Sequence, residues 1–394
     1  MPDLLLLALL LAAVAIGWWL GRRERQGADP ATQPPTLAKD YFVGLNYLLN
    51  EQQDQAIETF IGALEVNSDT IDTHIALGNL FRSRGEADRA VKVHQNLLAR
   101  PTLTDHQGDR VQLELSRDFL HLGLLDRAER LLQGLVRDSQ DDALRQSAKR
   151  LLVDLLEREG EWQAALDVAT PQLVKQHEDI ARAAAHWFCE LAARERQSAS
   201  PTLARRHLKQ ALATDPRCVR ANLLLAEMEL DTARYRQAIR LLRRIPDQDP
   251  AFTPTMLEPL ARAYRLLDDE PGLIDCLHEL LDTAPSIDVT LLLAETLRHQ
   301  HGTPQTAQAL VSEQLDRQVS LAGIDYLLTL YQQTSAETAK ERFALLQRHA
   351  RTLLQAQPAH RCRRCGFTGD QLHWRCPRCR SWGTIKPISG FPAE

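Results

Sequence analysis

The chain has 394 residues, enough for two or three domains of ordinary size and for a large hydrophobic core. Its net charge is −5, from 47 Lys and Arg against 52 Asp and Glu, which excludes a globally basic nucleic-acid-binding protein. The modest glycine and proline counts (18 and 19) and only seven cysteines exclude low-complexity, collagen-like and disulfide-framework chains.

The N-terminus predicts a membrane anchor over residues 1–21. Residues 4–20 carry no charge, and at ~1.5 Å per residue they reach roughly 25 Å, the lower end of a bilayer span. A cleaved signal peptide is the alternative, but it needs positive charge before the apolar run, where only Asp3 stands. Arginines follow the run at positions 22, 23 and 25, so we expect the N-terminus to face outward and the main body to lie in the cytoplasm.

Residues 22–36 predict a linker, because they show no apolar periodicity and contain three prolines. From residue 37 to residue 357 a frame of about 34 residues repeats. Frame positions 8 and 20 are small, which lets two antiparallel helices approach, and positions 11 and 24 fill the space beside them. The frame is clearest in four units, which contain Gly44, Tyr47, Ala56, Phe60 and Ala63; then Gly78, Phe81, Ala90, His94 and Leu97; then Ala192, Ala204, Leu208, Ala211 and Pro216; then Ala226, Ala238, Leu242, Ile245 and Pro250.

This pattern resembles the tetratricopeptide repeat (TPR), although Asp40 and His74 stand where that repeat has tryptophan. We therefore expect an all-α superhelical solenoid of about eight to nine helix pairs, with a small insertion at 102–108 and a degenerate pair over 321–357 that caps the array. Glycine and alanine pairs mark the weaker units: Gly123 with Ala128, Gly160 with Ala165, and Gly302 with Ala307.

The concave face of such a solenoid binds extended segments or partner helices. The TPR resemblance places residues of the first helix of each pair in this groove, and the simpler explanation for each is a solvated helix face. The four residues so placed are Asn79, Arg82, Arg220 and Glu227.

The strongest local motif lies in the C-terminal segment 358–394, where two CxxC pairs stand ten residues apart. Four thiolates complete a closed tetrahedral site, which indicates a structural metal ion that replaces a hydrophobic core. The predicted ligands are Cys362, Cys365, Cys376 and Cys379. The spacing alone accepts zinc or iron, but the short gap resembles zinc ribbons more than electron-carrying rubredoxins, so zinc is favoured. His360 and His373 are weaker substitutes.

The metal-binding segment is strongly basic, with seven Arg or Lys against one acid between residues 360 and 387. We favour the interpretation that these cations offset the thiolate charge and dock the ribbon onto an acidic solenoid. The alternative is that they bind nucleic acid, with Phe367, Trp374 and Trp382 as stacking platforms. Arg363 and Arg378 are the predicted docking residues.

No catalytic motif stands out. His278-Glu279 starts a metalloprotease-like HExx run, but the second histidine is replaced by Asp282, and no phosphate-binding or nucleophile-elbow motif occurs. Cys189, Cys218 and Cys276 are expected to be reduced packing residues. The sequence therefore predicts a protein that is not an enzyme.

The ordered combination of an apolar segment ending in WWLGRR, TPR-like repeats, and CRRCG…CPRC resembles the lipopolysaccharide assembly protein B family of Gram-negative bacteria. The resemblance covers essentially the whole chain. It implies a TPR array with a rubredoxin-like domain that holds metal through the four cysteines. It also implies an inner-membrane adaptor that promotes degradation of the deacetylase LpxC by the protease FtsH and couples to the sensor YejM.

Two other functions stay open on the sequence. One is a membrane-tethered RNA-binding or ribosome-associated module that uses the basic ribbon, and the other is a redox carrier if the ion is iron. Self-association is left open too.

Overall fold

The computed structural model describes residues 71–101, 103–198, 200–283, 285–301 and 304–388, together with isolated positions at 43, 46, 47, 55 and 59. The predicted anchor, the linker and most of the first predicted repeat lie outside these residues. No described helix combines the length and apolar character that a membrane crossing requires. The chain divides after Ala148 into two compact units, which are described separately.

The first unit is helical, and its last helix, α8, continues into the second. The helices of its described part are α4 (Ile71–Ser83), α5 (Ala87–Leu98), α6 (Asp105–Leu122), α7 (Leu125–Asp138) and α8 (Asp142–Glu159). Helix α4 packs against α5, and α6 packs against α7. This chain-neighbour pairing is the arrangement that the small-residue frame predicts.

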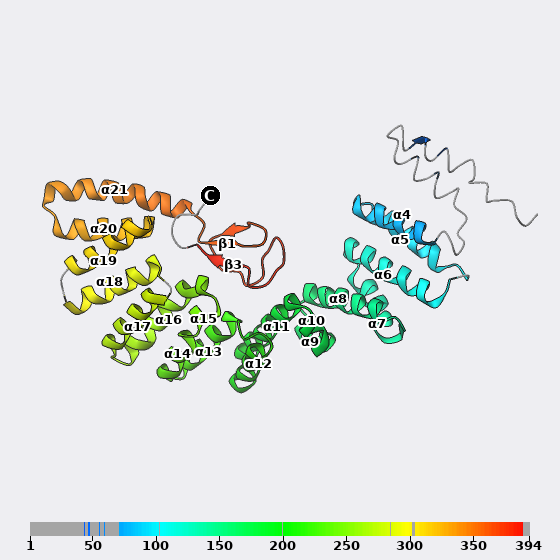
Figure 1. The fold of residues 1–394 in the computed structure, drawn as a ribbon, viewed down its shortest axis with the longest axis horizontal. Helices are drawn as coiled ribbons and strands as arrows, with labels where there is room; N and C mark the ends of the chain where they lie inside the picture. Colours follow the sequence, from blue (N-terminus) through cyan, green and yellow to red (C-terminus); the bar gives the residue numbers. More distant parts are fainter. Residues whose placement is uncertain are drawn as a thin grey trace, which may run out of the picture. The chain divides into compact units, whose positions relative to one another are not determined.

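The second unit continues the same pairing and ends in a small sheet (Figure 1). Its first helices are α9 (Trp162–Val168), α10 (Pro171–Gln176), α11 (Glu178–Gln197), α12 (Pro201–Thr214), α13 (Val219–Asp231), α14 (Tyr235–Leu242), α15 (Ile245–Gln248) and the 3-10 turn η1 (Pro250–Phe252). There follow α16 (Thr253–Leu266), α17 (Glu270–Thr283), α18 (Ile287–His301), α19 (Pro304–Arg317), α20 (Leu321–Thr334) and α21 (Glu337–Ala356).

Local sequence sets several helix ends. Thr104 and Gln107 form a reciprocal capping box at the start of α6, and Gly123 ends that helix with φ 73°. The second half of the predicted insertion over 102–108 forms the first turn of α6, which begins at Asp105.

The predicted frame positions form the core. Ala192, Ala204, Ala226 and Ala238 are all fully buried. At Gly78 a Cβ would stand 2.4 Å from the ring of His94, so only glycine allows α4 and α5 to approach this closely. The larger side chains at the other frame positions, such as Leu208 and Leu242, are also fully buried. Burial of each leucine side chain contributes roughly 1.5–3 kcal/mol to folding. The predicted all-α TPR solenoid is confirmed.

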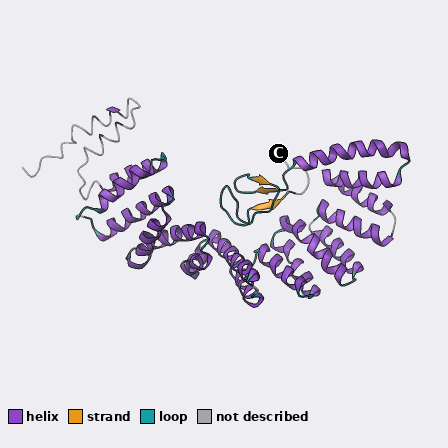
Figure 2. Ribbon diagram, turned by 180° about the vertical axis from the view of Figure 1, so that it is seen from behind, coloured by secondary structure: helices purple, strands orange, loops and turns teal. Residues whose placement is uncertain are grey.

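The C-terminal strands form a three-stranded antiparallel sheet, coloured orange in Figure 2. Its strands are β1 (His360–Cys362), β2 (Thr368–Gly369) and β3 (Ile385–Pro387), in the order β2-β1-β3. Cys362 on β1 pairs with Ile385 on β3. We call residues 360–388 the ribbon. It belongs to the second unit and lies beside α11, α15 and η1 of that unit (Figure 1).

Candidate metal centre

Two similar turns bring the cysteines of the ribbon together. In the first, the Gly366 amide donates to the Cys362 carbonyl over 3.0 Å, and Gly366 has φ 74°. In the second, the Arg380 amide donates to the Cys376 carbonyl over 2.8 Å, and Arg380 has φ 58°. A residue with positive φ after each CxxC pair lets the chain curl around the sulfur atoms. Glycine adopts this conformation readily at the first turn, whereas nothing about an arginine indicates it at the second.

The four sulfur atoms converge on one point. The Cys362 and Cys379 Sγ atoms are 3.7 Å apart, those of Cys365 and Cys376 are 3.6 Å apart, and all four lie within 4.8 Å of one another. A tetrahedral ion with sulfur ligands at ~2.3 Å requires sulfur–sulfur distances of about 3.8 Å. The four predicted ligands therefore fit one structural metal ion, and neither His360 nor His373 joins them among the described residues.

Protonation of this thiol set is uneven. Burial alone would raise the pKa of Cys362, but hydrogen bonds from Thr384 and from the backbone amides of Cys365 and Arg364 outweigh it and lower the pKa to about 6. Burial raises the pKa of Cys376 to about 12. A bound cation would remove this difference, because it holds every ligand as the thiolate.

The ribbon docks onto the helices through a buried acid. Trp382, only 6% exposed, donates its indole N–H to the Glu157 carboxylate on α8, and Trp187 on α11 donates to the same oxygen over 3.1 Å. The Arg375 guanidinium lies 3.5 Å from the other oxygen and donates to the Glu157 carbonyl over 3.0 Å. Two indoles and a cation compensate the burial of this carboxylate.

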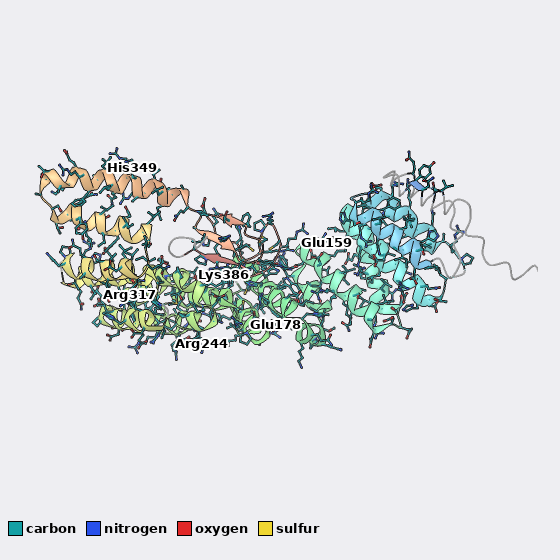
Figure 3. All side chains as sticks on the ribbon, turned by 45° about the horizontal axis from the view of Figure 1, so that its top comes forward. Glu159, Glu178, Arg244, Arg317, His349 and Lys386 are labelled. Carbon is teal, nitrogen blue, oxygen red and sulfur yellow. The ribbon has the colours of Figure 1, made fainter. Side chains whose placement is uncertain are left out.

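A second docking contact lies at η1. The Trp374 ring stacks on Phe252 with centroids 5.3 Å apart, and the ammonium of Lys386 lies 4.0 Å above the same Phe252 ring. Lys386 also forms an ion pair with Asp249, and Figure 3 labels it where the ribbon meets the helices. Burial lowers the pKa of Lys386 although Asp249 opposes this effect. An aromatic stack and an ion pair therefore hold the ribbon here.

The predicted docking residues have other surroundings. Arg378 reaches the Cys365 carbonyl inside the ribbon, over 3.4 Å, and the exposed Arg363 side chain has no hydrogen-bond or ion-pair partner among the described residues. Docking runs instead through Arg375, Lys386 and two tryptophans. The sequence does contain one indication of this docking contact. Trp374 and Trp382 flank the second CxxC pair, and two side chains of this size are too large for the core of so small a sheet.

The predicted groove residues are also accounted for. In the first unit, Arg82 bonds to Asp118 and Glu114, each over 2.7 Å, and to the Asn79 amide oxygen over 2.6 Å. In the second, Arg220 pairs with Glu190 over 2.7 Å. These are intramolecular roles, and partner binding by Asn79 and Arg82 stays a prediction.

Glu227 and Arg220 line a hollow of about 550 Å³ that the ribbon shares. Glu227 is half exposed and pairs with Arg196 over 2.9 Å. Leu372 and Trp374 contribute from the ribbon side of this hollow. The docked ribbon is thus part of the surface that these helices present.

These features define a class of protein: a TPR solenoid that carries a rubredoxin-type metal-binding domain on its helices. Family models agree with this class, since residues 360–387 match "Rubredoxin metal binding domain" and residues 73–106 and 196–256 match "Tetratricopeptide repeat".

The chain belongs to the lipopolysaccharide assembly protein B family. It is 34% identical to Lipopolysaccharide assembly protein B of Escherichia coli (strain K12) over 389 residues, 98% of each chain. It is also 34% identical to the protein of that name from Haemophilus influenzae, over 99% of each chain. A solved tetratricopeptide repeat protein from Parabacteroides merdae is 14% identical with a TM-score of 0.34, and covers 67% of this chain and 99% of its own.

Proposed function

We propose that this chain is a non-enzymatic inner-membrane adaptor that limits lipopolysaccharide synthesis by promoting FtsH-dependent proteolysis of LpxC. The observation that carries the proposal is its 34% identity, over nearly the full length of both chains, to proteins named for lipopolysaccharide assembly. A repeat solenoid with a closed metal site also favours binding over chemistry, since such a site leaves no open coordination position for a substrate.

The physical mechanism is tethering. An anchor over residues 1–21 would hold the helices beside the inner leaflet, with the N-terminus in the periplasm and the body in the cytoplasm. Binding of LpxC to the helices would raise its effective concentration at the membrane protease FtsH without new contacts between those two proteins. The anchor would also place the chain beside the membrane sensor YejM, which would regulate it.

The metal ion in this proposal is zinc, and its role is structural. It would hold the turns that aim Trp374, Arg375 and Trp382 at the helices, so that the ribbon completes the surface beside Arg220 and Glu227. Iron would serve as well geometrically, and a colourless purified protein with one zinc per chain would support zinc.

RNA binding is the less favoured alternative, and the docked ribbon weighs against it. Of the three aromatics that would stack on bases, Trp382 is buried against Glu157 and Trp374 is stacked on Phe252. Two of the basic residues, Arg375 and Lys386, are paired with acids of the helices. We therefore expect no specific RNA retention by the purified chain.

The test measures the half-life of LpxC in cells that lack their own family member and carry the full chain, the chain without residues 1–21, or no chain. The full chain should shorten the half-life only while FtsH is active, and the unanchored form should do so less. An LpxC half-life that is the same with and without the full chain would overturn the proposal.

A further inference from the structure

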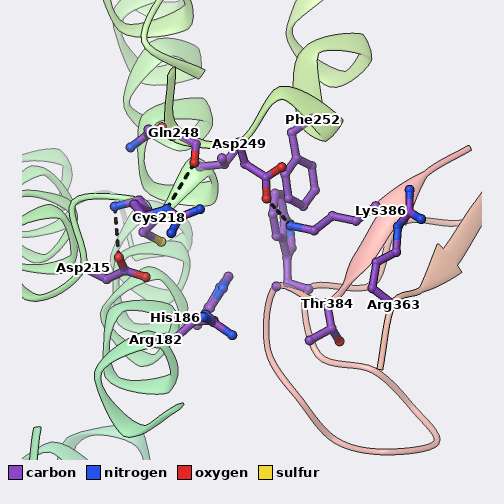
Figure 4. A pocket seen from close by; sticks show the side chains of 14 residues that line it. Arg182, His186, Asp215, Cys218, Gln248, Asp249, Phe252, Arg363, Thr384 and Lys386 are labelled. Carbon is purple, nitrogen blue, oxygen red and sulfur yellow. Dashed lines mark hydrogen bonds and ion pairs between the residues drawn. The ribbon is translucent and has the colours of Figure 1, made fainter. Parts of the chain in front are cut away.

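A cavity of about 270 Å³ lies between the ribbon and the helices of the second unit (Figure 4). Helix α11 contributes Arg182 and His186, the turn before α13 contributes Arg217, and the ribbon contributes Arg363, Thr384 and Lys386. In Figure 4, Arg182 and His186 lie on the helix side of the cavity and Thr384 and Arg363 on the ribbon side. Neither the metal site nor the hollow at Glu227 includes these arginines.

The cations around this cavity outnumber the acids. Lys386 is paired with Asp249, and Asp215 accepts from the backbone amide of Arg217 over 2.9 Å rather than from a side-chain cation. Among the described residues the guanidiniums of Arg182 and Arg363 have no hydrogen-bond or ion-pair partner. The guanidinium of Arg217 reaches only the Gln248 carbonyl, through Nε over 3.5 Å.

Arg182, Arg217 and Arg363 are exposed, and several other exposed arginines of the unit also pair with no acid among the described residues; these three are set apart because they line one cavity together. Nearby arginines have carboxylates: Arg220 pairs with Glu190, Arg205 with Glu229, and Arg196 with both Glu227 and Asp231. Three arginines without an acid around one cavity leave the positive charge there uncompensated by the protein. A cavity with this surplus attracts an anion, and guanidinium forks match the oxygens of phosphate in geometry.

His186 provides a second, independent observation. It is only 4% exposed, it lines the cavity, and its Nδ1 atom is buried without a hydrogen-bond partner. The ring is held by stacking on Trp382, with centroids 5.0 Å apart, and its Nε2 faces Gly383, where a Cβ would stand 3.2 Å away. A buried ring nitrogen without a partner is costly unless a ligand or water completes it.

We propose that this cavity binds a dianionic phosphate group, held by Arg182 and Arg217 from the helices and Arg363 from the ribbon, with His186 completing its hydrogen bonds. Such a ligand would bridge the two surfaces and stabilise the docked ribbon, because only the docked arrangement brings the three arginines together. The phosphate group belongs either to a soluble phosphomonoester or to a lipid headgroup, and the test separates these sources. The inference does not depend on the proposed role in LpxC turnover.

The test measures binding by calorimetry to the metal-loaded full chain, purified in detergent at constant ionic strength. The probes are inorganic phosphate, glycerol 3-phosphate and short-chain dihexanoyl phosphatidic acid. The variants are Arg182→Gln with Arg217→Gln and, as a matched control, Arg244→Gln, an exposed arginine outside the cavity that Figure 3 labels. Hydrogen exchange of the ribbon amides without phosphate checks that the double variant remains docked.

Wild type and the Arg244 control should bind phosphate alike, and the double variant should bind at least tenfold more weakly. If glycerol 3-phosphate binds as well as the lipid analogue, the source is soluble, whereas a strong preference for phosphatidic acid assigns a lipid headgroup. Equal binding of all three probes to wild type and the docked double variant, or no binding of any probe to wild type, overturns the proposal.

Discussion

Glu157 and Trp382 stand 225 residues apart in the chain, yet the indole of Trp382 donates a hydrogen bond to the Glu157 carboxylate. Trp187 donates to the same oxygen, and Arg375 lies beside the other. A single acid on α8 therefore organises one end of the ribbon contact. Its side chain is largely buried, so the surrounding donors depend on it.

Replacement of Glu157 by alanine should release the ribbon. It leaves two buried indole N–H groups and one guanidinium without their acceptor, and we expect a loss of about 2–4 kcal/mol in the free energy of unfolding. Ribbon amides should exchange faster by hydrogen-exchange mass spectrometry. Glu178→Ala, at the start of α11, is the control and should change the ribbon little (Figure 3). Unchanged ribbon protection in Glu157→Ala would contradict this account of docking.

Loss of the metal ion should also release the ribbon from the helices, because the ribbon itself would unfold. Cys362→Ser removes a ligand, and because bound metal replaces a core in so small a domain, the ribbon should unfold and bind no ion. Elemental analysis should give one ion per wild-type chain, and limited proteolysis should cut the variant within residues 360–388. Cys276→Ser, in buried surroundings on α17, is the control and should keep its ion. An intact, protease-resistant ribbon without metal would refute the structural role.

Stability should fall in mild acid because of His186. Burial, and next the charges of Arg220, Arg182 and Lys386, lower the pKa of His186 well below 6.5 in the folded state. The unfolded chain therefore binds the proton first, so this contribution is complete above about pH 6.5 and is lost as the pH falls, by up to ~1.4 kcal/mol per pH unit. Urea unfolding between neutral pH and about pH 5 measures the slope.

His186→Gln should reduce that slope, whereas His349→Gln, exposed on α21 and labelled in Figure 3, should not. Metal content is measured at each pH, because loss of the ion would add its own dependence. Identical slopes in wild type and His186→Gln would show that His186 is not the titrating group.

In the first unit, Arg82 should matter for folding before any partner is considered. The Asp118 carboxylate that it contacts is fully buried and also lies 2.5 Å from Nδ1 of the equally buried His94. Arg82→Ala would leave this acid without its cation, and we expect a loss of about 3–5 kcal/mol in the stability of the unit. Thermal unfolding compares it with Arg137→Ala, which removes an exposed pair with Asp138 and should change little. Equal midpoints for the two variants would contradict the network.

This network affects how a groove experiment is interpreted. Charge reversal at Arg82 would place a third acid beside Glu114 and Asp118, so loss of partner capture could follow from unfolding alone. Glu227, half exposed and beside the hollow that the ribbon shares, is a better position for testing partner binding.

The features that could be predicted from the sequence share a local cause. Gly78 and Ala238 had to be small because adjacent helices touch there, and that constraint recurs with each repeat. The cysteine ligands were predictable because two residues between cysteines place both sulfurs on one ion. Each of these signals lies within a single repeat or turn.

The docking contact could not be derived in this way. Arg363, Arg375 and Arg378 look equivalent in the sequence, and only the fold shows that Arg375 faces Glu157. Docking of the ribbon was the favoured expectation, but the tryptophans were named only in the less favoured alternative, as base-stacking platforms, because nothing local indicates that a helix far upstream covers them. Arg380 illustrates the same limit, since its positive φ is imposed by the metal turn rather than by its own preference.

The ribbon follows α21 directly, so it is the last of the described elements to leave the ribosome. Until then Trp187 is the only indole donor to Glu157 among the described residues, and one face of Phe252 is uncovered. The docking surface of the earlier helices is therefore completed only after the ribbon has been synthesised and has bound its metal ion. Maturation of the second unit is thereby linked to synthesis of the ribbon and to the metal supply of the cell, so a chain interrupted before the ribbon, or starved of metal, would carry an unfinished surface at Glu157 and Phe252.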